Sequence, residues 1–112
     1  MPASVREFLP LTHVLYAVLL SLAEKADHPY ELVRRIRERS DGRIDPGTGS
    51  FYSVLAQAER QGLIRASGEQ PSSRRRIYEI APLGRRVLAA EADRLASQLK
   101  ATEAVLVPGR HT

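Results

Sequence analysis

Residues 44–80 read IDPGTGSFYSVLAQAERQGLIRASGEQPSSRRRIYEI, and this stretch decides the fold. It opens on an Asp-Pro-Gly turn, after which a helix is predicted from Ser50 to Gln61. Thr48 or Ser50 is expected to accept hydrogen bonds from the free amides of the first turn. Gly62 can adopt the left-handed conformation that ends a helix, so the helix is bounded at both ends.

The two faces of this predicted helix differ in chemistry. Its apolar side chains recur at helical spacing and predict one buried stripe: Phe51, Leu55 and Ala58. The remaining side chains are polar and small enough for a DNA groove: Ser50, Ser53, Gln57 and Arg60. We expect the helix to pack with one face and to present the other to DNA.

Two short strands, Ile64–Ser67 and Arg75–Ile80, are predicted next, because β-branched and aromatic residues gather there. The polar connection between them is longer than a tight hairpin turn and should project as a wing. Where the wing rejoins the sheet, three consecutive arginines, Arg74, Arg75 and Arg76, can reach phosphates or a minor groove. The alternative is that they are solvated charges that keep an edge strand from aggregating.

With these residues, the chain resembles the PadR family of winged helix-turn-helix transcriptional regulators over nearly its whole length. The most specific segments are HPYEL at 28–32, GSFY at 49–52, GLI at 62–64 and RRRIYEIAPLG at 74–84. The family usually has glycine, proline, leucine, tyrosine and threonine where this chain has Pro29, Ser53, Ala58, Ile77 and Ala81. These departures concern packing and helix capping and remove no DNA-facing group. The resemblance implies a dimeric repressor of a nearby gene, frequently relieved by a small molecule.

The composition agrees with a small DNA-binding protein. The chain has 112 residues, enough for one domain and an extension, and a net charge of +4 that attracts polyanions without showing that any is bound. It has no cysteine, which excludes disulfides and thiolate metal sites. The longest apolar run, Val14–Leu22, is shorter than the about 20 residues that span a bilayer, and the amino terminus lacks the parts of a secretory signal. We therefore expect a cytoplasmic location.

Two further helices precede the organising stretch, after an arm formed by residues 1–10. The first runs from its cap, Thr12, to about Lys25, and it is apolar on more than one side, which indicates a partner subunit as its second neighbour. The second begins at Pro29 and ends before Gly42, with a predicted buried face that comprises Tyr30, Leu32, Val33 and Ile36. Residues 43–44 are expected to add a short strand to the wing sheet.

A long helix is predicted from Pro82 to about Leu106, and at 1.5 Å per residue it spans about 35 Å, more than the small core can cover. Its apolar positions alternate by four and three, as in a coiled-coil seam: Leu88, Ala92, Leu95, Leu99, Thr102 and Leu106. We expect these residues to form a dimer interface; the alternative is packing on their own domain.

The predicted fold is thus mainly α with a small β-hairpin (α+β): a winged helix-turn-helix domain in residues 1–81, a dimerisation helix in 82–107 and a tail in 108–112.

An enzyme is not expected. The three histidines, at positions 13, 28 and 111, lack metal-ligand spacing, and no nucleophile motif accompanies them. The glycine-rich segment at residues 46–50 lacks the lysine of a phosphate-binding loop. We predict no catalytic residue, metal or cofactor.

Two sets of binding residues follow. The predicted DNA contacts are Thr48, Ser50, Tyr52, Ser53, Gln57, Arg74, Arg75 and Arg76. For Tyr52, a hydroxyl that reaches a phosphate and a ring half-buried under the wing are both compatible with the sequence.

A candidate pocket for an apolar or aromatic effector between subunits comprises Val14, Ala17, Val18, Ala92, Leu95 and Leu99; a dry interface is the alternative. The competing function is a winged-helix protein-interaction module without a specific DNA site.

Overall fold

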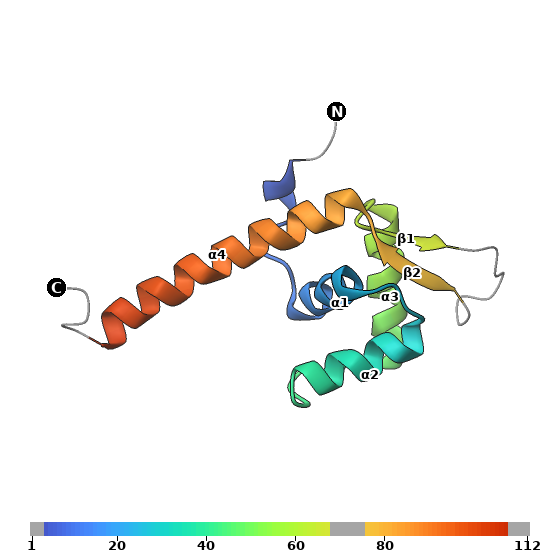
Figure 1. The fold of residues 1–112 in the computed structure, drawn as a ribbon, viewed down its shortest axis with the longest axis horizontal. Helices are drawn as coiled ribbons and strands as arrows, with labels where there is room; N and C mark the ends of the chain where they lie inside the picture. The colour runs from blue at the N-terminus through green and yellow to red at the C-terminus, as the bar shows by residue number, and fades with distance from the viewer. Residues whose placement is uncertain (1–3, 68–75, 108–112) are drawn as a thin grey trace.

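The computed structural model describes residues 4–67 and 76–107. The elements follow in the order 3-10 helix η1 (Val5–Phe8), α1 (His13–Glu24), α2 (Pro29–Arg39), α3 (Thr48–Arg60), β1 (Ile64–Ser67), β2 (Ile77–Ile80) and α4 (Pro82–Leu106). The hairpin and the free end of α4 extend to opposite sides of the helical body (Figure 1). A mainly helical chain with one antiparallel hairpin confirms the predicted fold class.

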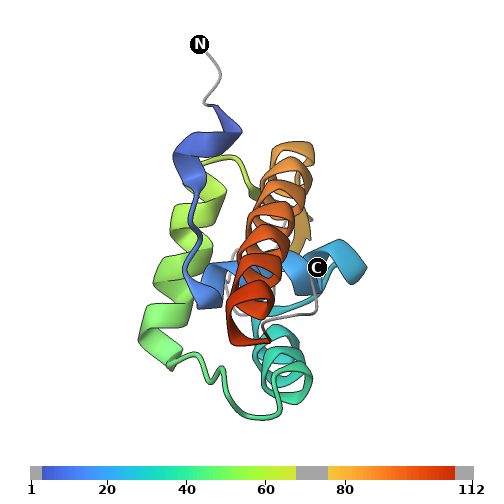
Figure 2. The same cartoon turned by 90° about the vertical axis from the view of Figure 1, so that its left-hand side faces the viewer.

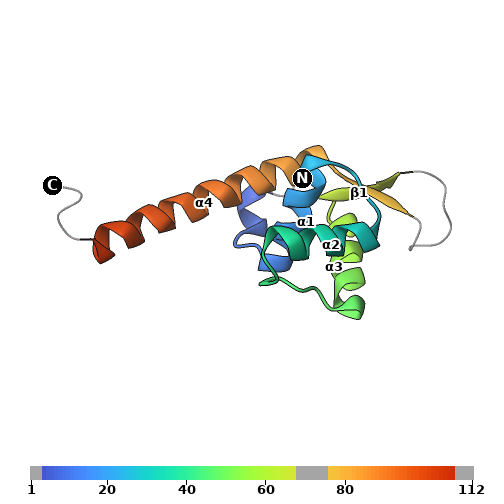
Figure 3. The same cartoon turned by 60° about the horizontal axis from the view of Figure 1, so that its bottom comes forward.

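The core forms around α1, which packs against α2, α3, α4 and β2. Figure 3 shows α2 and α3 on one side of α1 and the first half of α4 on the other. The buried side chains come from every one of these elements and from the residues at the start of β1: Val18, Leu19, Leu32, Ile36, Phe51, Leu55, Ala58, Leu63, Ile64, Tyr78, Ile80 and Val87. The predicted apolar stripe of α3 is therefore confirmed as its buried face.

The predicted cap of α3 is wrong. The residue before the helix is Gly47, in extended conformation, and no side chain caps the first turn. Since the helix begins at Thr48, two residues earlier than predicted, Ser50 lies inside the first turn, where its hydroxyl donates back to the carbonyl of Gly47 at 3.3 Å. The other end is as predicted, because Gly62 has a φ of +79°.

The wing sheet pairs Ile64 with Ile80 and Ser67 with Ile77, so β2 begins two residues later than predicted. The expected third strand at residues 43–44 is wrong: an isolated bridge joins Asp27 to Tyr78, with N–H···O distances of 3.1 and 2.9 Å. Ile44 does not pair with the sheet, because its N–H donates to the hydroxyl of Ser40 at 2.9 Å, in the loop that follows α2.

Arg35 ties this bridge to the helices. Its side chain is 10% exposed and donates to the carbonyl of Ser21 at 2.7 Å and to the Asp27 carboxylate at 3.2 Å. A third bond reaches Glu24 at 2.7 Å. The end of α1, the body of α2 and the edge of the hairpin are therefore held in one arrangement, which fixes the wing relative to the helices.

The N-terminal arm is held by a buried acid that sequence patterns did not predict. Glu91 of α4 is 1% exposed and accepts a hydrogen bond from the N–H of Leu11 at 2.7 Å. Arg94, one turn along, pairs with the same carboxylate. The Arg94 guanidinium and then the Leu11 N–H lower the pKa of Glu91 below its usual value, against the opposing effect of burial.

This depressed pKa predicts a pH dependence of stability. A carboxyl whose folded pKa lies below its unfolded value stabilises the fold above about pH 4.5, and the contribution disappears as the pH falls through the folded pKa. Glu91→Gln should therefore flatten the decline in unfolding free energy below that pH. Urea unfolding from pH 3 to 7 measures it, with the exposed Glu103→Gln as control. An acid limb identical to that of the native chain would show that the Glu91 contacts do not stabilise the fold.

Candidate nucleic-acid interface

The outer face of α3 is built from small and polar side chains. They are all exposed: Gly49, Ser50, Ser53, Gln57 and Arg60. A Cβ placed on Gly49 would meet no atom within 4 Å, so this position faces open space. Because the opposite face is locked in the core, this is the surface that a major groove, which admits an α-helix, can receive.

The two serines of this face offer hydrogen-bond acceptors. Ser50 donates its hydroxyl proton to the carbonyl of Gly47, and Ser53 donates to the carbonyl of Gly49, both at 3.3 Å. A hydroxyl that has used its proton keeps two lone pairs. In this arrangement the serines complement amino groups on base edges, which are donors in the major groove.

Gln57 and Arg60 form a pair that presents donors. The Arg60 Nη2 donates to Gln57 Oε1 at 2.6 Å, so the amide oxygen is occupied and the amide NH₂ remains a donor. Bidentate pairing of Gln57 with adenine needs that oxygen, so Arg60 must release it on binding. Arg60 was placed on the polar face expected to meet DNA but was not named as a contact, although its spacing of three from Gln57 indicates that the two side chains can pair.

Tyr52 lies half-buried between the two helices of the helix-turn-helix unit. Its ring packs edge to face on Phe51, with centroids 6.3 Å apart. It borders a hollow of about 230 Å³ between the start of α2 and the start of α3, together with Pro29, Tyr30, Val33, Arg34, Arg37, Pro46 and Phe51. The Tyr52 ring is therefore half-buried, as one of the two predictions had it, and lies between α2 and α3.

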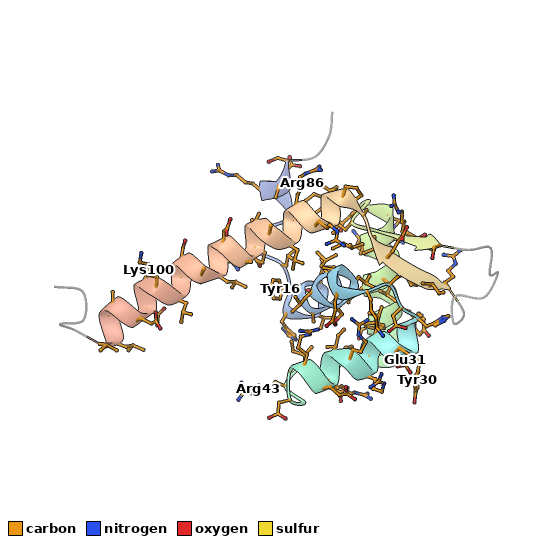
Figure 4. The ribbon with its side chains drawn as sticks, in the orientation of Figure 1. Tyr16, Tyr30, Glu31, Arg43, Arg86 and Lys100 are labelled. Carbon is orange, nitrogen blue, oxygen red and sulfur yellow. The ribbon has the colours of Figure 1, made fainter. Side chains whose placement is uncertain are left out.

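Tyr30 was predicted to be buried and is 78% exposed. Pro29, at the first position of α2, takes the buried place beside it, and Tyr30 points away from the domain (Figure 4). An exposed phenol at a helix N-terminus can donate to a DNA phosphate, as the nearby backbone N–H groups also can. Tyr30 therefore joins the candidate interface.

Of the three arginines predicted for the wing, the structure describes Arg76. Arg74 and Arg75 lie outside the described residues, as does the side chain of Thr48. Arg76 stands at the start of β2 with Nη1 3.5 Å from Glu59 Oε1, and both side chains are more than one-third exposed. Because Glu59 belongs to α3, this long ion pair connects the hairpin to the helix and offsets part of the Arg76 charge.

The second half of α4 extends beyond the domain and carries exposed apolar side chains. Leu99 is 59% exposed, and the others are Leu95, Val105, Leu106 and Val107; Ala92 and Thr102 are exposed as well. Lys100 marks this projecting part in Figure 4. Leu88, also predicted for the seam, is half-buried and packs against the core of its own domain. Apolar residues on a projecting helix are typical of an interaction surface.

The proposed effector residues on α1 need one correction. Val18 is fully buried in the core, so it cannot line a cavity between subunits, whereas Val14 is half-buried and Ala17 is 8% exposed. A hollow of about 190 Å³ adjoins Ala17, and it is lined by Tyr16, Ala17, Leu20, Ser21, Ile36, Arg39, Ser40 and Ile44. Of the residues predicted for the effector pocket, Ala17 borders this hollow.

Residues 4–67 and 76–107 contain no group of three or more His, Cys, Asp or Glu side chains that could hold a metal ion. Within the same ranges, no helix combines the length and the apolar character that crossing a membrane requires.

Solved structures with the same fold come from several organisms. A transcriptional regulator from Clostridium thermocellum is 23% identical, with a TM-score of 0.70 over 88% of this chain and 90% of its own. A PadR family transcription regulator from hypervirulent Clostridium difficile is 24% identical, with a TM-score of 0.70 over 85% and 99%. A PadR-like transcription factor from Bacteroides fragilis is 15% identical, with a TM-score of 0.69 over 82% and 88%. At these identities the likeness shows the fold.

Among curated proteins, no sequence matches the chain. The family described as "Transcriptional regulator PadR-like family" matches residues 18–90, which contain α2, α3, the hairpin and parts of α1 and α4. The match covers more than half of the 112 residues. The chain therefore belongs to the PadR-like family and is a DNA-binding transcriptional regulator rather than an enzyme.

Proposed function

We propose that the chain is a homodimeric repressor whose two α3 helices enter major grooves of a two-fold-related operator near the gene it controls. The observation that carries the proposal is the exposed face of α3, where Gly49, Ser53, Gln57 and Arg60 lie opposite a fully buried apolar stripe. Small residues near the start of the helix allow close approach to base edges, and the later residues supply donors. Such a regulator acts where chromosomal DNA is found, in the cytoplasm.

Selection from random duplexes tests this function. The native chain should enrich a motif with two-fold symmetry, since each subunit supplies one α3. The competing function is a winged-helix protein-interaction module, which requires no DNA site. Enrichment of no motif, with binding equal to that of the starting pool, would favour that module.

Gln57→Ala should relax the selected motif at one symmetric pair of positions. The amide reads a base edge in this account, and a well-made bidentate contact discriminates by about 1–3 kcal/mol. Gln98→Ala, an exposed glutamine on α4, is the matched control. Selection with both variants measures the effect, and a motif unchanged by Gln57→Ala would remove this residue from base recognition.

The wing arginines should supply affinity without sequence information. Replacing Arg74 and Arg75 with alanine is expected to weaken operator and nonspecific DNA alike, and to reduce the salt slope by about 1 for each phosphate that the variant no longer neutralises. Arg6→Ala, an exposed arginine on the arm, is the control. Titrations at several salt concentrations give the slope; an unchanged slope would assign both arginines to solvated edge charges.

The dimer is proposed to form through the second half of α4, with Ala92, Leu95, Leu99, Thr102 and Leu106 in the seam. This division of labour assigns residues 1–81 to DNA binding and residues 82–107 to dimerisation. An apolar or aromatic effector between subunits would be lined by Val14, Ala17, Ala92, Leu95 and Leu99. Such a ligand acts only if it binds one dimer arrangement more tightly than the other.

A further inference from the structure

A groove of about 520 Å³ lies between the N-terminal arm and α3. The arm supplies Glu7, Phe8, Pro10, Leu11 and Thr12; α1 supplies Leu15; and α3 with its C-cap supplies Ser53, Val54, Gln57, Ala58, Arg60 and Gln61. In Figure 2 the arm passes beside the upper part of α3 before it enters α1. The volume lies in the range of about 300–1,000 Å³ that small-molecule sites occupy.

The arm is a fixed wall of this groove. The N–H of Leu11 is bonded to the buried carboxylate of Glu91 at 2.7 Å, and η1 packs against α4. Ser4 caps η1 with a complete capping box, which orders the residues before Phe8. The groove is therefore formed before any ligand arrives.

The apolar part of the lining is aliphatic except for one ring. Phe8, Leu11, Leu15 and Val54 are half-buried, and Ala58 is fully buried behind them. Phe8 is the one aromatic residue among the lining residues. Methyl and methylene groups on both walls suit a flexible alkyl chain better than a flat ring, which gains most from aromatic partners.

The polar part of the lining has acceptors on the arm and donors on α3. On the arm, the Glu7 carboxylate accepts from the N–H of Ser4 at 3.1 Å, and the Thr12 hydroxyl accepts from the N–H of Leu15 at 3.2 Å. On α3, Gln57 Oε1 accepts from Arg60. Within the described part of the chain, the Gln57 amide NH₂ and the rest of the Arg60 guanidinium make no other hydrogen bond. These groups complement an anion.

We propose that this groove binds a medium-chain alkyl carboxylate, with the carboxylate against Gln57 and Arg60 and the chain along the arm. The charges of Glu7 and Arg60, on opposite walls, direct the anionic end toward α3. The regulatory consequence rests on the proposed DNA-binding role of α3: a ligand on Gln57 and Arg60 and an operator exclude each other. Relief of binding then needs no change in the dimer.

Calorimetry on the DNA-free full chain tests the site itself. Hexanoate, octanoate and decanoate should bind with affinity that rises about fourfold per CH₂, until the groove is full. Octan-1-ol and octylamine, which lack the anion, should bind at least about tenfold more weakly than octanoate. Absence of heat with all three carboxylates at each of two temperatures, or octanoate binding no tighter than the alcohol, would overturn the proposal. So would inorganic phosphate or benzoate binding as tightly as octanoate. The second temperature is needed because burial of an alkyl chain can have an enthalpy near zero.

Variants locate the binding. Phe8→Ala, on the arm wall, should weaken octanoate at least about fivefold and leave operator affinity within about twofold, with the exposed Arg6→Ala as its control. Gln61→Glu adds a like charge on the exposed groove edge without touching the core, so it should weaken octanoate even if Phe8→Ala loosens the arm. Octanoate affinity unchanged in Gln61→Glu and in Arg60→Gln would place the ligand elsewhere and overturn the assignment.

Competition is measured separately. Octanoate should raise the apparent Kd for operator DNA once its concentration exceeds its own Kd for the groove, and more steeply than in proportion because both α3 helices of a dimer must be free. Sedimentation should show an unchanged dimer. If the chain binds no operator, the calorimetric result still decides the groove; if no carboxylate binds, the operator titration still decides the DNA-binding function. Carboxylate binding without any effect on operator affinity would overturn the competitive mechanism.

Discussion

Gly84→Ala is expected to lower the free energy of unfolding by more than about 3 kcal/mol, because α4 approaches the strand region too closely for a side chain. A Cβ at Gly84 would stand 2.1 Å from the carbonyl oxygen of Leu63 and 2.9 Å from a side-chain carbon of Ile80. That oxygen also accepts the N–H of Ala81 at 2.9 Å, so it cannot move without breaking the junction between hairpin and helix. The gain of about 1 kcal/mol from alanine in a helix does not offset the clash.

Gly49→Ala is the matched control, because it makes the same change inside α3 where the added Cβ meets nothing within 4 Å. It should raise stability by about 0.5–1 kcal/mol. Urea unfolding of both variants at one protein concentration makes the comparison. Equal stability of Gly84→Ala and the native chain would contradict the close approach of α4 to Leu63 and Ile80.

If the proposed dimer forms, Leu99→Glu is expected to convert it to monomer and to reduce operator affinity by about 10²–10⁴, since two half-sites no longer bind together. Leu99 is 59% exposed in the single chain, so its replacement leaves the domain fold intact. In the proposed seam the new carboxylate would be buried without a partner, at a cost of several kcal/mol. Leu95→Glu should act in the same way.

Ser97→Glu adds the same charge to the same exposed stretch of α4, but on the opposite side of the helix at about 100° per residue. It should remain dimeric. Sedimentation velocity and an operator titration compare the variants with the native chain. A stable dimer of both leucine variants would place the interface on another surface.

Local patterns predicted the helices well. The spacing of Phe51, Leu55 and Ala58 indicated the buried face of α3, and Gly62 indicated its end, because both depend on neighbours within a turn or two. The start of α3 was misplaced since its cap, Gly47, has no side chain to mark it. Tyr30 was misassigned because Pro29, rather than the larger apolar ring, occupies the buried place.

Contacts between distant residues were beyond the sequence patterns. The bond from the Leu11 N–H to Glu91, the bridge from Asp27 to Tyr78 and the Arg35 network each join segments that no periodicity connects. In the sequence, Glu91 has the pattern of a surface acid on a helix, and it is buried because the arm covers it. The groove beside α3 exists because the bond from Leu11 to Glu91 holds the arm in place. No local sequence pattern predicts that bond, so the effector pocket was predicted at the subunit interface instead.

Sequence-specific recognition of duplex DNA is tested by a titration of the native chain against its selected operator and a scrambled duplex, each at two salt concentrations. A sequence-specific regulator should show a steep fall in affinity with salt on both duplexes, together with an operator preference of about 10³ or more at the higher salt. Equal affinity for the two duplexes, or affinity that does not change with salt, would contradict sequence-specific recognition.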